Sequence, residues 1–298
     1  MSPSIKGQKS SADREEERLF HRYIELLANE RSFDGLFCET VELGRATLLY
    51  NSNFLGDPVF NHVKLSEDLM SDGEVRIEEF EEVLQEIDEV SRRLSLKSIT
   101  LFLEDFWANS SRFQTAAVET GYRIVEQMKI LSMQVGRTVS SGEETTPNSR
   151  SSSKNQVSVF ETDNVEAWNK VFMRSYQIPE EWKIELLRRE KGFLKENGKS
   201  TMLLLALEGN EKEISRASGC LLLHEFPAHL MGVYCVGTIP EKRGRGIARK
   251  MLEESDLVAR RRDCDFLTLQ TVASDNVTPM YLKLGYNLDF ERSVLHRV

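Results

Sequence analysis

A glycine-rich, basic turn is the part of the sequence that indicates a chemical function most clearly. Val236–Leu252 reads VGTIPEKRGRGIARKML, in which a predicted strand leads through Pro240 and two glycines, Gly244 and Gly246, into a predicted helix. The first amides of a helix lack internal partners, glycines let a ligand approach the backbone, and the helix dipole favours negative charge. Five basic residues and one acidic residue lie within 241–250. The sequence therefore predicts a phosphate site at this turn.

Spacing excludes two common phosphate-binding motifs at this turn. A P-loop requires Gly-Lys-Ser/Thr five positions after its first glycine, where this chain has Arg249, Lys250 and Met251. A dinucleotide-binding fingerprint requires a small third residue where Arg249 stands. What remains is R-x-x-G-x-A, from Arg243 to Ala248. This pattern resembles the pyrophosphate loop of the GNAT superfamily of acyl-CoA N-acyltransferases, Q/R-x-x-G-x-G/A.

A second segment carries the same resemblance. Asn276–Tyr286, NVTPMYLKLGY, is similar to the later GNAT segment in which an Asn contacts the cofactor and a Tyr five residues on points at the thioester sulfur. The resemblance implies acetyl-CoA as cosubstrate and a set of cofactor-binding residues: Val236, Gly237, Thr238, Arg243, Gly244, Arg245, Gly246, Ile247, Ala248 and Asn276.

The resemblance also implies catalytic roles. Backbone amides at the end of the fourth strand of this fold would polarise the thioester carbonyl. Tyr281 would be the general acid, with a half-buried structural aromatic as the alternative. Gly237 fits either a bulge near the ligand or a packing glycine. Many relatives carry a base on the fourth strand, but LMGVYCVGT has no carboxylate, so Glu225 is the candidate base and an exposed hairpin-end charge its alternative.

The acceptor side is predicted from the segment before the cofactor motifs. Asn169–Trp182 resembles the first helix, loop and second helix that line the acceptor cleft of the family. Tyr176 and Trp182 are the candidate wall residues, and both also fit an ordinary core role. The resemblance leaves the amine acceptor open between a small molecule and a protein side chain.

Alternating strands and helices must position these residues. Apolar runs predict a hairpin of 201–207 with 217–223, a strand over 231–238 and another over 266–270. Helices are expected from Ile247 onward, and from a Thr278 N-cap to a stop at Gly285.

Length and composition indicate two folded units. The 298 residues are 40% hydrophobic and 29% charged, as in ordinary globular chains. Residues 137–156 contain nine Ser or Thr and predict a flexible linker. We therefore expect a disordered tail over 1–18, a first domain over 19–136 and the catalytic GNAT domain over 157–298.

The net charge and the positions of the cysteines limit the classes of binding partner that we expect. The formal net charge of -9 disfavours nucleic acid and anionic membranes, and no apolar run is long enough for a membrane span. Four scattered cysteines and five histidines form no metal-ligand spacing, so we predict no metal. A cytoplasmic location fits best, and the oligomeric state cannot be predicted.

The first half parallels the end of the second. Ser98–Met133 repeats the order strand, Asn-containing loop, helix, Gly-Tyr and strand. Four residues before Gly121 stands Ala117, whereas Tyr281 stands four before Gly285. We expect a degenerate GNAT-like copy without the acid, with a different α/β cap as the alternative.

These observations predict an α/β (α+β) protein with a mixed, mostly antiparallel sheet flanked by helices, as two tandem GNAT-like domains. The expected function is an N-acetyltransferase that moves an acetyl group from acetyl-CoA to a primary amine in a ternary complex. The alternative is a noncatalytic acyl-CoA sensor or scaffold.

Overall fold

The computed structural model describes residues 11–35, 37–57, 60–66, 69, 77–105, 110–136, 156–209 and 213–298. In the first half, the helices are α1 (Ser11–Asp34), α3 (Ile77–Arg93) and α4 (Ser110–Glu119). Its strands are β1 (Glu39–Glu42), β2 (Ala46–Tyr50), β3 (His62–Leu65), β4 (Ile99–Glu104) and β5 (Arg123–Gln134).

The second half starts at β6 (Val157–Thr162). The other strands are β7 (Thr201–Glu208), β8 (Gly219–Glu225), β9 (Leu230–Thr238), β10 (Phe266–Val272) and β11 (Asn287–Arg297). The α-helices are α5 (Val165–Tyr176), α6 (Lys183–Asn197), α7 (Ile247–Arg261) and α8 (Thr278–Lys283). Short 3-10 helices are η1 (Glu180–Trp182), η2 (Ile214–Arg216), η3 (Pro240–Lys242) and η4 (Ala273–Asp275).

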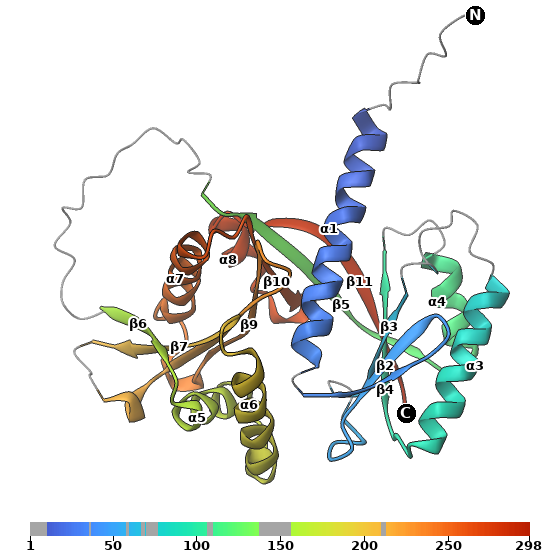
Figure 1. Ribbon diagram of the computed structural model, residues 1–298, viewed down its shortest axis with the longest axis horizontal. Coiled ribbons are helices and arrows are strands. Elements are labelled where there is room, and N and C mark those ends of the chain that lie inside the picture. Colours follow the sequence, from blue (N-terminus) through green and yellow to red (C-terminus); the bar gives the residue numbers. More distant parts are fainter. Residues whose placement is uncertain are drawn as a thin grey trace, which may run out of the picture.

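All these strands belong to one sheet. Their order is β1-β2-β3-β4-β11-β5-β10-β9-β8-β7-β6, and α1 crosses its middle between the helices of the two halves (Figure 1). Neighbouring strands are antiparallel except for β3 with β4 and β9 with β10. The mostly antiparallel, helix-flanked sheet predicted from the sequence is confirmed.

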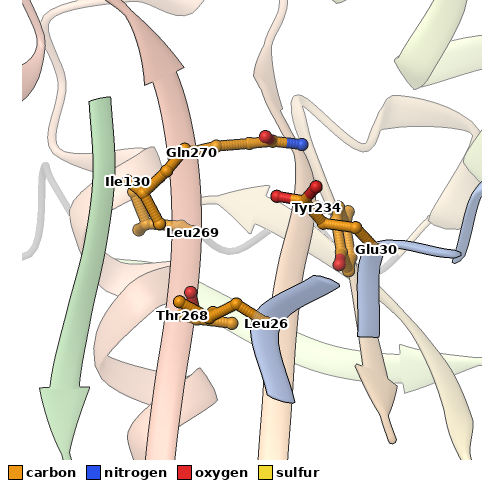
Figure 2. A pocket seen from close by; sticks show the side chains of 7 residues that line it. All are labelled: Leu26, Glu30, Ile130, Tyr234, Thr268, Leu269 and Gln270. Atoms are coloured by element: carbon orange, nitrogen blue, oxygen red, sulfur yellow. The ribbon is translucent and has the colours of Figure 1, made fainter. Parts of the chain in front are cut away.

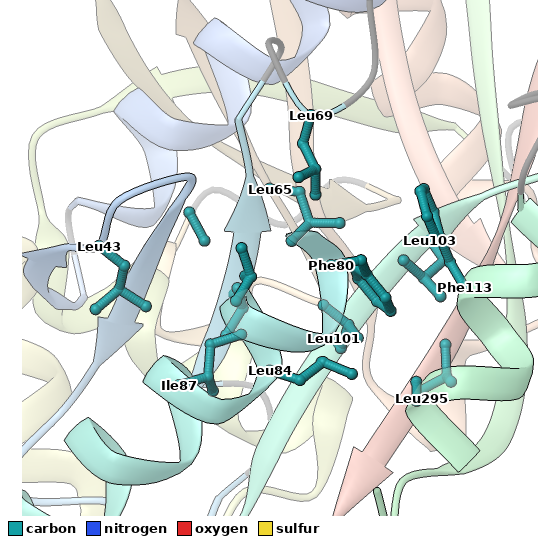
Figure 3. Close-up of a cluster of buried hydrophobic side chains, with 14 of the residues drawn as sticks. Leu43, Leu65, Leu69, Phe80, Leu84, Ile87, Leu101, Leu103, Phe113 and Leu295 are labelled. Carbon is teal, nitrogen blue, oxygen red and sulfur yellow. The ribbon is translucent and has the colours of Figure 1, made fainter. Parts of the chain in front are cut away.

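The two halves exchange their last strands. β5 lies between β10 and β11 of the second half, and β11 lies between β4 and β5 of the first. As a result, Leu295 of β11 belongs to the first-half core, near Leu101 and Phe113 (Figure 3), and Leu131 of β5 belongs to the second-half core. Neither half closes its core from its own residues.

The described order of elements recurs within the chain. β3, α3, β4, α4 and β5 follow one another as β9, α7, β10, α8 and β11 do. Gly121 and Gly285, which end the corresponding helices, have φ values of +98° and +96°, a conformation in which glycine avoids a Cβ clash. The degenerate-copy hypothesis for the first half stays a prediction that this order supports.

Three sequence expectations need correction or fall outside the description. The tail predicted over 1–18 is too long, because α1 begins at Ser11; residues 1–10 are outside the described part. The linker predicted over 137–156 lies outside it too, apart from Gln156. Thr278 is the first helical residue of α8, and Val277 takes the N-cap position.

No described helix has both the length and the apolar character that crossing a bilayer requires.

Candidate functional site

β9 and β10 part from each other midway. Their parallel register covers only Leu230–Gly232 with Phe266–Thr268, and it ends there. On its other edge β9 pairs with β8 but carries an irregularity, because Cys220 faces Gly237 whereas Leu222 faces Tyr234. The extra residue is accommodated at Cys235, whose φ is +54°. A bulged strand that leaves its parallel neighbour opens a wedge between the two strands.

The glycine turn follows directly from the open end of β9. Gly244 and Gly246 have φ values of +74° and +81°, and a Cβ built on either would meet no atom within 4 Å. Gly246 is the N-cap of α7, and no side chain caps that helix. The amides of the first turn of α7 are therefore not capped by a side chain and lie at the positive end of the helix dipole, which suits a phosphate group.

The basic residues of the turn are more engaged than their sequence suggests. Arg243 donates from Nη2 to the Ser175 carbonyl at 2.8 Å and from Nε to the Thr238 carbonyl at 3.2 Å. This side chain joins the end of α5 to the end of β9, so it positions the turn. The part of the motif that is left to bind a ligand is therefore the backbone of residues 244–248.

Two glutamates neutralise part of the positive charge. Glu208 accepts from Lys242 at 2.6 Å and from Arg245 at 3.0 Å. Glu253 accepts from Arg249 at 3.0 Å and lies 3.4 Å from Lys250. The excess of basic residues counted along the turn therefore overstates its local charge. The pairs of Arg245, Arg249 and Lys250 are substantially exposed, and such pairs contribute little to stability and can open toward a phosphate.

Tyr281 lies in the first turns of α8, and only 6% of its surface is exposed. It packs in the second-half core with Met231 and Val233 of β9. Its ring meets Tyr286 edge to face at 5.9 Å between centroids. Burial raises the pKa of Tyr281 to about 12, with a further contribution from Asp275. The phenol keeps its proton throughout the neutral range.

Tyr176 and Trp182, the two predicted acceptor-wall residues, lie in different places. Tyr176 donates from Oη to the Val236 carbonyl at 3.1 Å, at the wedge. Desolvation and the neighbouring Cys235 raise its pKa well above the usual range. Trp182 instead packs against Phe54 of the first half, with 4.6 Å between centroids. It lines a separate cavity of about 410 Å³ together with residues 52–57.

Of the remaining residues predicted to bind the cofactor, Gly237 is packed against other residues and Asn276 is exposed to solvent. A Cβ at Gly237 would lie 2.7 Å from Ser175 Cβ and 2.9 Å from Cys220 Sγ, so this glycine packs against α5 and the bulge lies two residues earlier. Val236 and Thr238 flank it at the end of β9. Asn276 is exposed, has a φ of +54°, and donates from Nδ2 to the Ser274 carbonyl at 3.1 Å.

Glu225 is not brought to the wedge. It is the last residue of β8 and pairs in register with Met231, at the closed end of β9. Its carboxylate lies 3.7 Å from Nη1 of Arg262, the residue that follows α7. The strand between Met231 and Thr238 separates Glu225 from the glycine turn. This geometry does not support Glu225 as the base. The residue lies at the end of the hairpin, as in the alternative, but only 19% of its side chain is exposed.

Residues of α1 reach the wedge and were not anticipated. Asn29 accepts a hydrogen bond from the Tyr234 hydroxyl and donates to the His224 carbonyl at 3.1 Å. Phe33 stacks on Tyr234 with 3.7 Å between ring centroids. These contacts join residues roughly two hundred positions apart, and no local sequence pattern announces them.

Within the described residues, no group of three or more His, Cys, Asp or Glu is arranged to hold a metal ion.

The sequence of the second half matches a known protein family. Residues 164–286 match the profile of the acetyltransferase (GNAT) family, so this segment is a GNAT domain. A search of curated proteins found no match.

Solved structures show the same fold over most of the chain. A GCN5-related N-acetyltransferase from Kribbella flavida is 13% identical with a TM-score of 0.62, over 91% of this chain and 95% of that one. A functionally unknown conserved protein from Staphylococcus epidermidis is 11% identical with a TM-score of 0.58, over 87% and 94%. A tandem GNAT protein from the clavulanic acid biosynthesis pathway is 13% identical with a TM-score of 0.57, over 86% and 81%.

Proposed function

We propose that the second half of the chain is an N-acetyltransferase that moves an acetyl group from acetyl-CoA to a primary amine by direct attack in a ternary complex. One observation carries this proposal. The uncapped glycine turn at Gly246 follows the strand that opens the wedge, and Tyr281 belongs to the same buried cluster as Met231 and Val233 of that strand. This combination supports a thioester cosubstrate held at the turn, with a buried phenol available as the acid.

The residues of the turn and of β9 would hold the cosubstrate. Amides from Gly244 to Ala248 would receive the pyrophosphate, since both glycines have open surroundings and the turn lies, without a side-chain cap, at the positive end of the α7 dipole. The backbone at the end of β9 and the exposed Asn276 would contact the pantetheine arm. Bound acetyl-CoA supplies a thioester, whose carbonyl a fixed backbone amide can polarise.

Tyr281 would supply the proton that the leaving sulfur takes up. The amine nitrogen bonds to the carbonyl carbon, the C–S bond breaks, and the Tyr281 hydroxyl protonates the thiolate. The amine loses a proton to solvent, and the Tyr281 oxygen takes one back from solvent. With a pKa of about 12, Tyr281 is a weaker acid than a thiol near 8.5. The phenol is therefore expected to donate a hydrogen bond to the developing thiolate first and to complete the transfer late.

A noncatalytic acyl-CoA sensor or scaffold remains the second candidate. It is favoured by the position of Glu225, which leaves the wedge without the carboxylate base that the sequence suggested. Release of CoA in the presence of a panel of primary amines separates the two functions. The transferase releases CoA with at least one amine, whereas the sensor binds acetyl-CoA without turnover.

The first half is proposed as a degenerate copy with a structural or substrate-shaping role. Tyr122 donates its backbone N–H to the Ala117 carbonyl at 3.0 Å, as Tyr286 does to the Tyr281 carbonyl at 3.2 Å. Ala117 therefore occupies the place of the acid. The segment after β3, residues 66–79, holds six acidic residues and one basic residue, which disfavours a pyrophosphate.

The acceptor is proposed to be a small-molecule or protein amine, and the net charge of -9 favours a cationic one. A soluble cytoplasmic setting without nucleic acid or membrane partners is proposed on the same ground.

A further inference from the structure

The helix α1 covers the wedge on the face opposite α7 and α8. Successive side chains of a strand point to opposite faces, and Val233 packs in the core with Tyr281 and α7 whereas Tyr234 packs with Phe33 of α1. Gly232 lets α1 approach closely, because a Cβ there would lie 2.2 Å from Asn29 Oδ1. A first-half helix thus lies where a free second half would be open to an acceptor.

A small socket lies between α1 and the point where the strands part. Leu26 and Glu30 of α1, Tyr234 of β9, and Thr268 and Gln270 of β10 line it (Figure 2). Thr268 is the last residue of β10 paired with β9, so the socket lies at the vertex of the wedge. Its cavity of about 10 Å³ has room for one water-sized group.

Hydrogen-bond acceptors line this socket. The Gln270 Oε1 atom is buried and has no hydrogen-bond partner among the described residues. The Tyr234 hydroxyl donates its proton to Asn29, so only its lone pairs are left for another group. Gln270 extends from β10 toward Tyr234 and Glu30 (Figure 2).

Glu30 adds an ionised carboxylate to the socket, and two cations balance its charge. It accepts from Arg292 at 2.9 and 3.0 Å and from Lys64 at 2.7 Å, and these cations hold its pKa below the usual range despite burial. The carboxylate therefore stays ionised. Three bonds leave it with remaining acceptor capacity, since a carboxylate has about four lone-pair sites.

We propose that this socket receives the amino group of an unbranched primary alkylamine, so that the acceptor site is shared between α1 of the first half and the wedge of the second. A primary ammonium has three N–H donors and about the size of a water molecule, which suits a socket lined by Glu30, Gln270 Oε1 and the lone pairs of Tyr234. The bound ammonium must release one proton to solvent before its nitrogen can attack a thioester. Because the cavity has room for the amino group alone, the alkyl arm would leave it past Leu26. This assignment rests on the proposed acetyltransferase function for its place in a reaction, but the binding of an amine can be measured without turnover.

The test is the affinity of the full-length protein for n-propylammonium, measured by ligand-observed NMR. Gln270→Leu removes the unpaired acceptor and keeps the side-chain volume. Gln134→Leu, at an exposed position at the end of β5, is the matched control. Tetramethylammonium has the same charge but no N–H donor.

We expect the wild type and Gln134→Leu to bind n-propylammonium equally and Gln270→Leu to bind it about tenfold more weakly, the loss typical of a hydrogen bond to a charged group. Tetramethylammonium should not bind. Equal affinities for Gln270→Leu and the wild type would overturn the socket, as would tetramethylammonium binding as tightly as n-propylammonium.

The outcomes also separate this inference from the proposed function. If the protein binds n-propylammonium specifically but releases no CoA with any amine, the socket proposal stands and the proposed transferase function is wrong. If Gln270→Leu transfers acetyl groups to amines at the wild-type rate, the proposed transferase function stands and the socket proposal is wrong.

Discussion

Arg292, six residues from the C-terminus, donates both terminal guanidinium nitrogens to the carboxylate of Glu30 in α1, at 3.0 and 2.9 Å. Both side chains are almost fully buried. Lys64 donates to the same carboxylate, and Arg292 Nε lies 3.6 Å from Glu104. Because β11 lies between β4 and β5, this ion cluster joins the last strand of the chain to the first half.

Loss of Arg292 should therefore destabilise the whole protein. In Arg292→Met, Glu30 and Glu104 stay buried without their shared partner, and removing one member of such a buried ion pair costs about 3–5 kcal/mol. Arg249→Met breaks only the exposed pair with Glu253 and should cost less than about 1 kcal/mol. Urea unfolding followed by tryptophan fluorescence measures both. Similar small losses in the two variants would contradict the role of Arg292.

Glu190 should make the stability depend on pH. It is buried in α6, accepts from Asn169 Nδ2 at 2.9 and 3.0 Å, and burial raises its pKa to about 8, from an ordinary value of 4.5. Between these values the native state binds one more proton than the unfolded state, so stability falls as pH rises, by on the order of 1 kcal/mol per pH unit.

Glu190→Gln stays neutral and should remove this part of the decline between about pH 5 and 8. The buried Glu104, whose pKa burial raises to about 7, keeps its own contribution in the variant. Glu196→Gln, at an exposed position of the same helix, is the control. Urea midpoints at pH 5, 6.5 and 8 measure the effect. Parallel pH profiles for wild type and Glu190→Gln would show that the carboxyl titrates normally.

Gly246→Glu should abolish acetyl-CoA binding while the protein stays folded. The new carboxylate would lie at the uncapped amides of α7 and repel a pyrophosphate, so we expect at least roughly 100-fold weaker binding by calorimetry. Gly136 has the same φ of +81° and equally open surroundings at the end of β5. Gly136→Glu therefore carries the same backbone strain and should bind normally. Equal affinities in the two variants would move the phosphate site elsewhere.

Local patterns predicted most of the second half because its elements are short and strongly periodic. The strands at 201–207, 217–223, 231–238 and 266–270 all exist, and Gly285 ends a helix with a positive φ as expected. The N-cap predicted at Thr278 lies one residue after the observed N-cap, Val277, which is the usual uncertainty at a helix terminus.

The remaining predictions failed where they depended on how elements far apart in the sequence pack together. No helix was predicted over α1, and Ser11–Arg18 was assigned to the tail because this stretch is polar and has little hydrophobic periodicity. Glu225 was assigned to the site because the sequence does not show which residue of β9 it pairs with. In the structure that residue is Met231, at the closed end of the strand. Glu30 and Gln270 meet only through the packing of α1 across the sheet, so no local pattern could pair them.

The central claim is that Tyr281 assists acetyl transfer at the wedge. CoA release from acetyl-CoA with a panel of primary amines tests it directly, with Tyr286→Phe as the matched control. Tyr286 is also buried and its hydroxyl has no partner among the described residues, so removing that oxygen should leave the rate near that of the wild type. Tyr281→Phe should lower kcat by about 100-fold with little change in acetyl-CoA affinity. Equal rates for the two variants, or no CoA release by the wild type with any amine, would contradict the account.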